Sequence, residues 1–133
     1  MGRNRFVQPE IVRLELSDGD WVDVKKRLTV GEERAAFQAI VGEVNQQGWR
    51  RPNVEMVGIA EMVAYIVRWS FRDAQDLPIP FSVETIKGLD PDDFKEIEKA
   101  IEKHIAAVEK AVADAKNEKG GGSKSETTSP SAA

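Results

Sequence analysis

The segment from Val54 to Phe71 constrains the fold most, because it is apolar on nearly every side when drawn as a helix. Glu55, Glu61 and Arg68 are its only charged residues. A helix without a wide polar face is normally buried, so we expect one central helix here, capped by Asn53. With Glu61 and Arg68 inside it, the segment is unsuited to span a bilayer, which needs about 20 predominantly apolar residues.

A β-hairpin is expected before this segment. Residues 11–16 and 21–25 alternate apolar and charged side chains on either side of Ser17-Asp18-Gly19-Asp20. Such alternation around an Asp-Gly turn is a strong short-range hairpin signal. Because an isolated hairpin is only marginally stable in water, we expect its apolar side chains to pack against helices. These are Leu14, Leu16, Trp21 and Val24.

A first helix is predicted to begin at Thr29, which forms a capping box with Glu32. Apolar residues then recur at intervals of three and four, and Gly48 provides the stop signal. These residues are Ala36, Phe37, Ile40, Val41 and Val44. Gly42 lies inside the predicted helix and should weaken it by up to ~1 kcal/mol relative to alanine. An exposed loop over residues 49–52 is expected to follow.

The last helix is predicted over Pro91–Asn117, after a proline-containing connector (73–80) and a short helix over residues 82–88. Asp90-Pro91-Asp92-Asp93 combines an N-cap, a proline at the first helical position and carboxylates in the first turn. Its apolar positions step by three and four residues, which predicts a packing seam. The seam comprises Phe94, Ile97, Ile101, His104, Val108, Ala111 and Ala115, with Ile105 and Val112 alongside.

The two ends of the chain are polar. Residues 1–8 carry a single large aromatic, Phe6, and predict a flexible arm. Residues 119–133 form a Gly/Ser-rich tail that we expect to be disordered. Residues 9–118 are then one domain, and the predicted fold class is mainly α: a small helical domain with an N-terminal β-hairpin, a buried central helix, a long C-terminal helix and a disordered C-terminal tail.

Composition argues against several function classes. The 133-residue chain has no cysteine, so thiolate metal sites and Cys nucleophiles are excluded. With 19 basic and 23 acidic residues the net charge is -4, which argues against nucleic acid as a partner. The N-terminus lacks an apolar signal-peptide core, and no stretch reaches the length of a membrane span, so we expect a soluble, unsecreted protein with no membrane partner.

No motif predicts catalysis, a metal or a cofactor. The single histidine, His104, lies on the apolar seam of the last helix, so we interpret it as packed or facing a partner. The acidic clusters at 18–20 and 90–93 fit a turn and a cap, without the ligand series of an EF-hand. Residues 120–125 fail the spacing of a phosphate-binding loop. The chain is therefore predicted not to be an enzyme.

Apolar surface remains as the feature with functional content. The seam of the last helix and the connector Leu77–Phe81 either fold back on the central helix or contact another chain. We expect the following residues to bind a partner or a second copy: Ile79, Phe81, Ile97, Ile101, Ile105 and Val108.

The order and phrasing of the chain resemble the tail assembly chaperones of long-tailed bacteriophages and prophages. The resembling stretches are "LELSDGDWVDVKKRLTVGEERA" and "VAYIVRWSFRDAQDLPIPFSVETIKGLDPDDFKEIEKAIEKHI", together with the polar tail. The resemblance implies a helical factor of the host bacterial cytoplasm that binds the tape measure protein before the tail tube polymerises, and that is absent from the mature virion. It also implies two further partners: a longer form of the chain made by frameshifting, and other copies of the chain itself. The family provides no active-site motif to transfer.

Two other readings stay open from the sequence. A virion structural protein, such as a head–tail connector or tail completion factor, would present similar apolar faces and a terminal arm. A regulatory or antitoxin-like adaptor would do so too.

Overall fold

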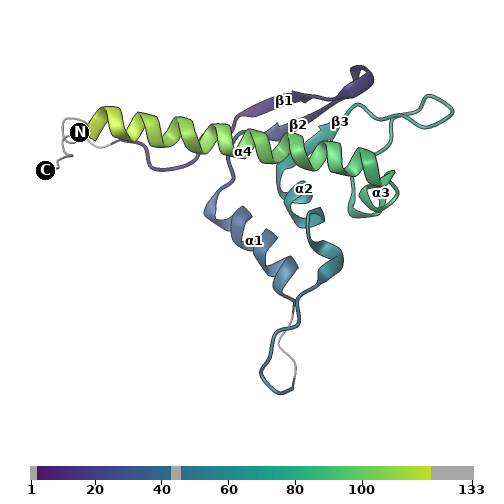
Figure 1. The fold of residues 1–133 in the computed structure, drawn as a ribbon, viewed down its shortest axis with the longest axis horizontal. Coiled ribbons are helices and arrows are strands. Elements are labelled where there is room, and N and C mark those ends of the chain that lie inside the picture. The colour runs from purple at the N-terminus through teal and green to yellow at the C-terminus, as the bar shows by residue number, and fades with distance from the viewer. Residues whose placement is uncertain (1–2, 43–45, 121–133) are drawn as a thin grey trace, which may run out of the picture.

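A computed structural model describes residues 3–42 and 46–120 of the chain (Figure 1). Its strands are β1 (Ile11–Glu15), β2 (Trp21–Lys25) and β3 (Ile66–Trp69). Its α-helices are α1 (Val30–Val41), α2 (Ile59–Tyr65), α3 (Val83–Lys87) and α4 (Pro91–Gly120). Two short 3-10 helices, η1 (Ser17–Gly19) and η2 (Val54–Met56), complete it. Helices predominate, as predicted, but they share the fold with a three-stranded antiparallel sheet in the order β1-β2-β3.

The N-terminal hairpin is confirmed. β1 pairs with β2 in a register that places Leu14 opposite Val22 and Arg13 opposite Asp23. At the tip, Asp18 and Gly19 both have positive φ angles, of 59° and 79°. Aspartate and glycine are among the residues that tolerate this region, which explains why the Asp-Gly pair turns the chain here.

The prediction of one central helix over Val54–Phe71 is wrong. η2 occupies the start of this segment, α2 follows the left-handed Gly58, and the chain becomes β3 directly after Tyr65. β3 pairs antiparallel with β2, and the shift in register leaves Val67 as an extra, bulged residue. The β-branched Ile66 and Val67 suit a strand, and pairing with the distant β2 overrides the local helical pattern. Asn53 precedes η2 but makes no side-chain cap bond.

The first helix begins as predicted and ends earlier. Thr29 and Glu32 form the complete capping box. α1 then stops at Val41, because Gly42 has a φ angle of 73° and ends the helix rather than lying inside it. The predicted apolar position Val44 lies outside the described residues.

The two C-terminal helices have the predicted starts. Ser82 caps α3, and Gly88 follows its last residue. The side chain of Asp90 accepts a bond from the amide of Asp92 at the first turn of α4. α4 continues to Gly120, past the predicted end at Asn117. The prediction of a disordered tail over residues 119–133 is therefore wrong for 119–120, which are helical, and residues 121–133 lie outside the described residues.

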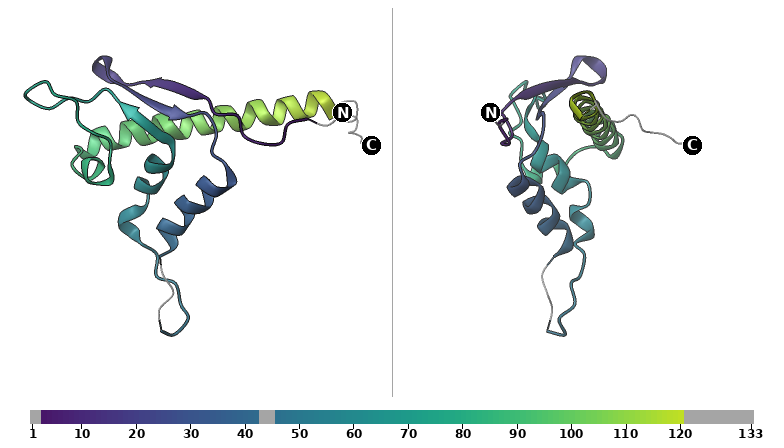
Figure 2. Two further views of the ribbon diagram at one scale, coloured as in Figure 1. Left: turned by 180° about the vertical axis from the view of Figure 1, so that it is seen from behind. Right: turned by 90° about the vertical axis from the view of Figure 1, so that its left-hand side faces the viewer.

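The core lies between the sheet and the helices. α4 covers one face of the sheet, and α1 and α2 project together away from both (Figures 1 and 2). Val22 and Val24 of β2, Met62 of α2, and Ile97 and Ile101 of α4 have no exposed surface. In the part of the chain that the structure describes, the opposite face of the sheet carries no helix (Figure 2).

The N-terminal arm contains neither helix nor strand from residue 3 to residue 10. Phe6 is 83% exposed, and the hydrogen bonds within the arm link Asn4, Phe6 and Gln8 to one another. The arm runs toward the end of the molecule at which α4 ends, away from the hairpin tip (Figure 1).

Candidate functional site: an exposed apolar surface on α1 and α2

The single histidine, His104, packs within the fold. His104 is 9% exposed, and its Nε2 lies 3.2 Å from the carbonyl oxygen of Lys25 and 3.1 Å from that of Lys26. Two acceptors fix Nε2 as the protonated nitrogen, which donates to them. The edge of the ring packs against Tyr65. The predicted packed role is confirmed, and the bond ties the middle of α4 to the end of β2.

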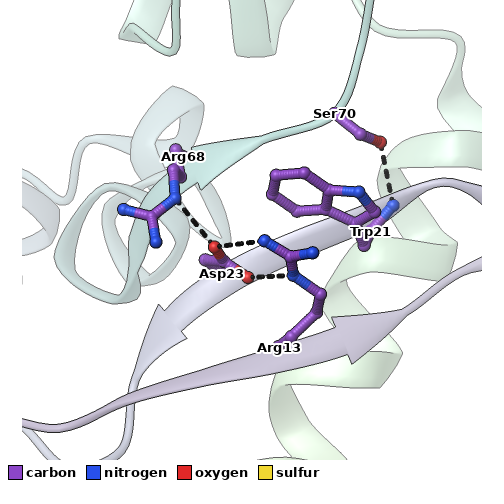
Figure 3. A network of polar contacts seen from close by, with 5 residues as sticks. All are labelled: Arg13, Trp21, Asp23, Arg68 and Ser70. Carbon is purple, nitrogen blue, oxygen red and sulfur yellow. Dashed lines mark hydrogen bonds and ion pairs between the residues drawn. The ribbon is translucent and has the colours of Figure 1, made fainter.

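The open face of the sheet carries a buried carboxylate held between two arginines (Figure 3). Asp23 is 2% exposed and accepts from Nε and Nη2 of Arg13, at 2.7 and 3.0 Å. Nε of Arg68 lies 2.8 Å from Oδ2 of Asp23, the oxygen that also accepts from Nη2 of Arg13. All three residues are cross-strand neighbours, one from each strand. This row of charges fixes the register of the sheet where no helix covers it.

The surroundings keep Asp23 ionised. The hydrogen bonds from Arg13 hold the pKa of Asp23 below its usual value, against the opposing effect of burial, and the charge of Arg68 acts in the same direction. The Arg13 guanidinium also stacks on the indole of Trp21, 3.6 Å from the ring centroid. Both arginines therefore have a structural use on this face.

The predicted partner-binding residues separate into three groups. Ile97 and Ile101 have no exposed surface and belong to the core of this chain, so we build no partner surface on them. Ile79, Phe81 and Ile105 are partly buried and pack against that core. The remaining one, Val108, is half-buried on the distal half of α4.

Specific contacts account for the connector residues. The carbonyl of Ile79 accepts a 2.6 Å bond from the indole N–H of Trp69, and the Phe81 ring packs edge-on against the same indole. The connector therefore folds back onto β3 of its own chain. This is the first of the two alternatives that the sequence left open for it.

Large apolar side chains are exposed on the projecting helices instead. Phe37 of α1 is 64% exposed, and Val54 of η2 is 78% exposed. The side chains that define this α1–α2 surface are Val30, Phe37, Val54, Val57 and Val63. All of them lie on α1, η2, α2 or the turn between η2 and α2. Exposed apolar side chains gathered on neighbouring elements are typical of a protein-binding surface.

The two helical residues of this surface that come from α1 lie in one row along it. Val30 and Phe37 are seven residues apart, and Val41 continues the row but is half-buried. Ala36 and Ile40 beside this row are also half-buried, and no residue of α1 is fully buried. The apolar residues of α1 thus form one wide face, of which the fold covers only a part. No signal in the sequence separates the exposed Phe37 from the half-buried Ile40 three residues later.

Glu61 of α2 lies beside two carboxylates of α4. Burial raises the pKa of Glu61, and the charges of Glu102 and Glu98 raise it further.

Within residues 3–42 and 46–120, no group of three or more His, Asp or Glu side chains is placed to hold a metal ion. In the same ranges no helix is both long and apolar enough to cross a membrane.

Comparison with known protein families, curated proteins and solved structures finds no match to this chain.

Proposed function

We propose that this protein is a bacteriophage tail assembly chaperone that binds the tape measure protein and keeps it soluble before the tail tube polymerises. The observation that carries the proposal is the α1–α2 surface, where Phe37 and Val54 are exposed by more than half. The resemblance of the sequence to tail assembly chaperones supplies the client. On this proposal the protein acts in the host cytoplasm and is absent from the mature virion.

The physical argument concerns aggregation. A tape measure protein is a very long helical chain, and exposed apolar stripes on such chains associate with one another. A helix lying on the α1–α2 surface would bury both partners' apolar side chains, and each fully buried large side chain is worth about 1.5–3 kcal/mol. Several copies along one client would add avidity without a tight individual contact.

Coexpression with the tape measure protein of the same phage tests the proposal. We expect the soluble fraction of the tape measure protein to rise with the wild-type chain and to fall back with the double variant Phe37→Ser/Val54→Ser. Both positions are exposed, so the variant should keep the wild-type circular dichroism spectrum and thermal midpoint.

The matched control is Leu77→Ser, which removes a 59% exposed apolar side chain from the connector, outside the α1–α2 surface. It should retain full solubilising activity. Equal solubility of the tape measure protein with wild type and with the double variant would contradict the proposal. So would the recovery of this chain at fixed copy number from purified particles by mass spectrometry, which is the result expected of a connector or completion factor.

A further inference from the structure

A groove of about 460 Å³ lies at the end of the molecule opposite the N-terminal arm. It is formed by the hairpin tip, the residues just after β3, and the first turns of α4. Its apolar side consists of the half-buried Leu16, Phe71 and Leu89. Its acidic side consists of Asp18, Asp20, Asp93 and Glu96. We call this site the tip groove.

Two of the four carboxylates are already bound. Glu96 accepts from the amide and the hydroxyl of Ser17, at 2.6 and 2.9 Å, and Asp20 accepts from the hydroxyl of Ser70 at 2.8 Å. Asp18 and Asp93 have no hydrogen bond or ion pair with any residue that the structure describes. The one basic residue in the lining, Arg72, donates to the carbonyl oxygen of Asp76 at 2.7 Å. The tip groove therefore offers an apolar wall beside four carboxylates, whose charge the single cation Arg72 balances only in part.

The N-terminal arm has the complementary chemistry. Arg3 and Arg5 make no ion pair with the described part of the chain, and next to them Phe6 exposes 83% of its surface. Arg50 and Arg51, beside Trp49, are the nearest equivalent in the sequence. That loop is already engaged, because Arg50 donates to the carbonyl of Gly42. The arm thus combines unpaired guanidinium groups with an unburied aromatic ring.

We propose that the tip groove receives the Arg3–Phe6 segment of a second copy of this chain. Phe6 enters the apolar side, and the two arginines pair with Asp18 and Asp93. In the structure the arm lies away from its own groove, at the opposite end of the long axis of the molecule (Figure 1). The contact is therefore between copies and head to tail, so that assembly continues into a closed ring or an open filament. This inference is independent of the proposed function.

Sedimentation velocity of the full chain over a range of concentrations tests the inference. We expect species larger than a monomer, with half-association shifted to at least roughly tenfold higher concentration in an arm variant, Phe6→Ser, and in a groove variant, Asp18→Asn/Asp93→Asn. Asparagine accepts the positive φ angle at position 18, so the groove variant should fold normally. Raising the salt concentration should weaken the wild-type assembly, because charge pairs contribute to it.

Mixing the two variants provides the sharpest outcome. Each has lost one half of the contact, so an equimolar mixture should form a one-to-one dimer and nothing larger. Trp49→Ser is the matched control for the arm, and Asp92→Asn, on an exposed residue of α4 outside the groove lining, is the control for the groove. Both controls should assemble as wild type does.

Four results would overturn the inference. They are a wild-type chain that stays monomeric at all concentrations, assembly that survives Phe6→Ser, assembly that is lost with Trp49→Ser, and a variant mixture that grows beyond the dimer.

Discussion

Asp23 and Arg68 face each other across the β2–β3 ladder, with Nε of Arg68 2.8 Å from the Asp23 carboxylate. Arg13 meets the same carboxylate from β1, so one buried charge links all three strands. The two arginine side chains remain about half exposed, so water can solvate their charges if the carboxylate is removed. The Asp23 carboxylate is therefore the group on which the open face of the sheet depends.

Replacing this carboxylate should destabilise the fold in a pH-dependent way. We expect Asp23→Asn to lower the free energy of unfolding by about 1.5–3 kcal/mol at neutral pH, because hydrogen bonds to a charged group are lost. The folded-state pKa lies below the ordinary value of 3.8. The advantage of wild type is therefore complete above that value and disappears as the pH falls through the folded-state pKa. Urea unfolding at a series of pH values measures this, with Asp92→Asn as an exposed control.

Removing the charge of Glu61 should have the opposite sign. Its pKa is raised above the ordinary value of 4.5 by burial and by Glu102 and Glu98, so the ionised form is disfavoured in the folded state. We expect Glu61→Gln to stabilise the protein by up to about 1 kcal/mol at pH 7. The gain should be absent below pH 4.5 and grow as the pH rises through the folded-state pKa. Thermal unfolding of both proteins at pH 7 and at a pH below 4.5 checks this. A loss of stability at pH 7 would contradict it.

Two isoleucines one helical turn apart on α4 should differ in their contribution to stability. Ile101 has no exposed surface, and Ile105 is only partly buried at the edge of the core. We expect Ile101→Ala to cost about 2–5 kcal/mol, because it leaves a cavity in the core. Ile105→Ala should cost clearly less. Chemical denaturation of the two variants provides the measurement. Equal losses in the free energy of unfolding would contradict the prediction.

Two glycines of the α1 region should respond to alanine in opposite directions. A Cβ at Gly42 would collide with the carbonyl oxygen of Arg51, and the positive φ angle disfavours any side chain there. Gly31 lies within α1, and the nearest atom to a Cβ at that position is 3.9 Å away. We expect Gly42→Ala to destabilise the protein and Gly31→Ala to stabilise it by about 0.4–1 kcal/mol. Differential scanning calorimetry distinguishes the two signs.

The elements that the sequence predicts correctly depend on neighbouring residues. The capping box of Thr29, the short helix that follows Ser82 and the start of α4 at Asp90 are each stabilised by side chains within three residues. The hairpin likewise depends on Asp18 and Gly19 at its tip. Local signals of this kind are visible in sequence because no distant contact is needed to complete them.

β3 could not be predicted in the same way. Ile66 and Trp69 are apolar in either a helix or a strand, and their pairing with β2 joins segments more than forty residues apart. The candidate site has the same difficulty, since exposure of Phe37 depends on which side of α1 the fold covers. For Ile97 and Ile101, the apolar seam indicated a packing surface correctly but did not say that its partner is the same chain.

The direct passage from Tyr65 to Ile66 leaves no linker between the last turn of α2 and the first residue of β3. A ligand that tilts α2 therefore cannot be accommodated by slack in the chain. A tilt of α2 would act directly on Ile66, which pairs with Val24 of β2, and the bulged Val67 is the first position beyond it at which the ladder departs from regular pairing.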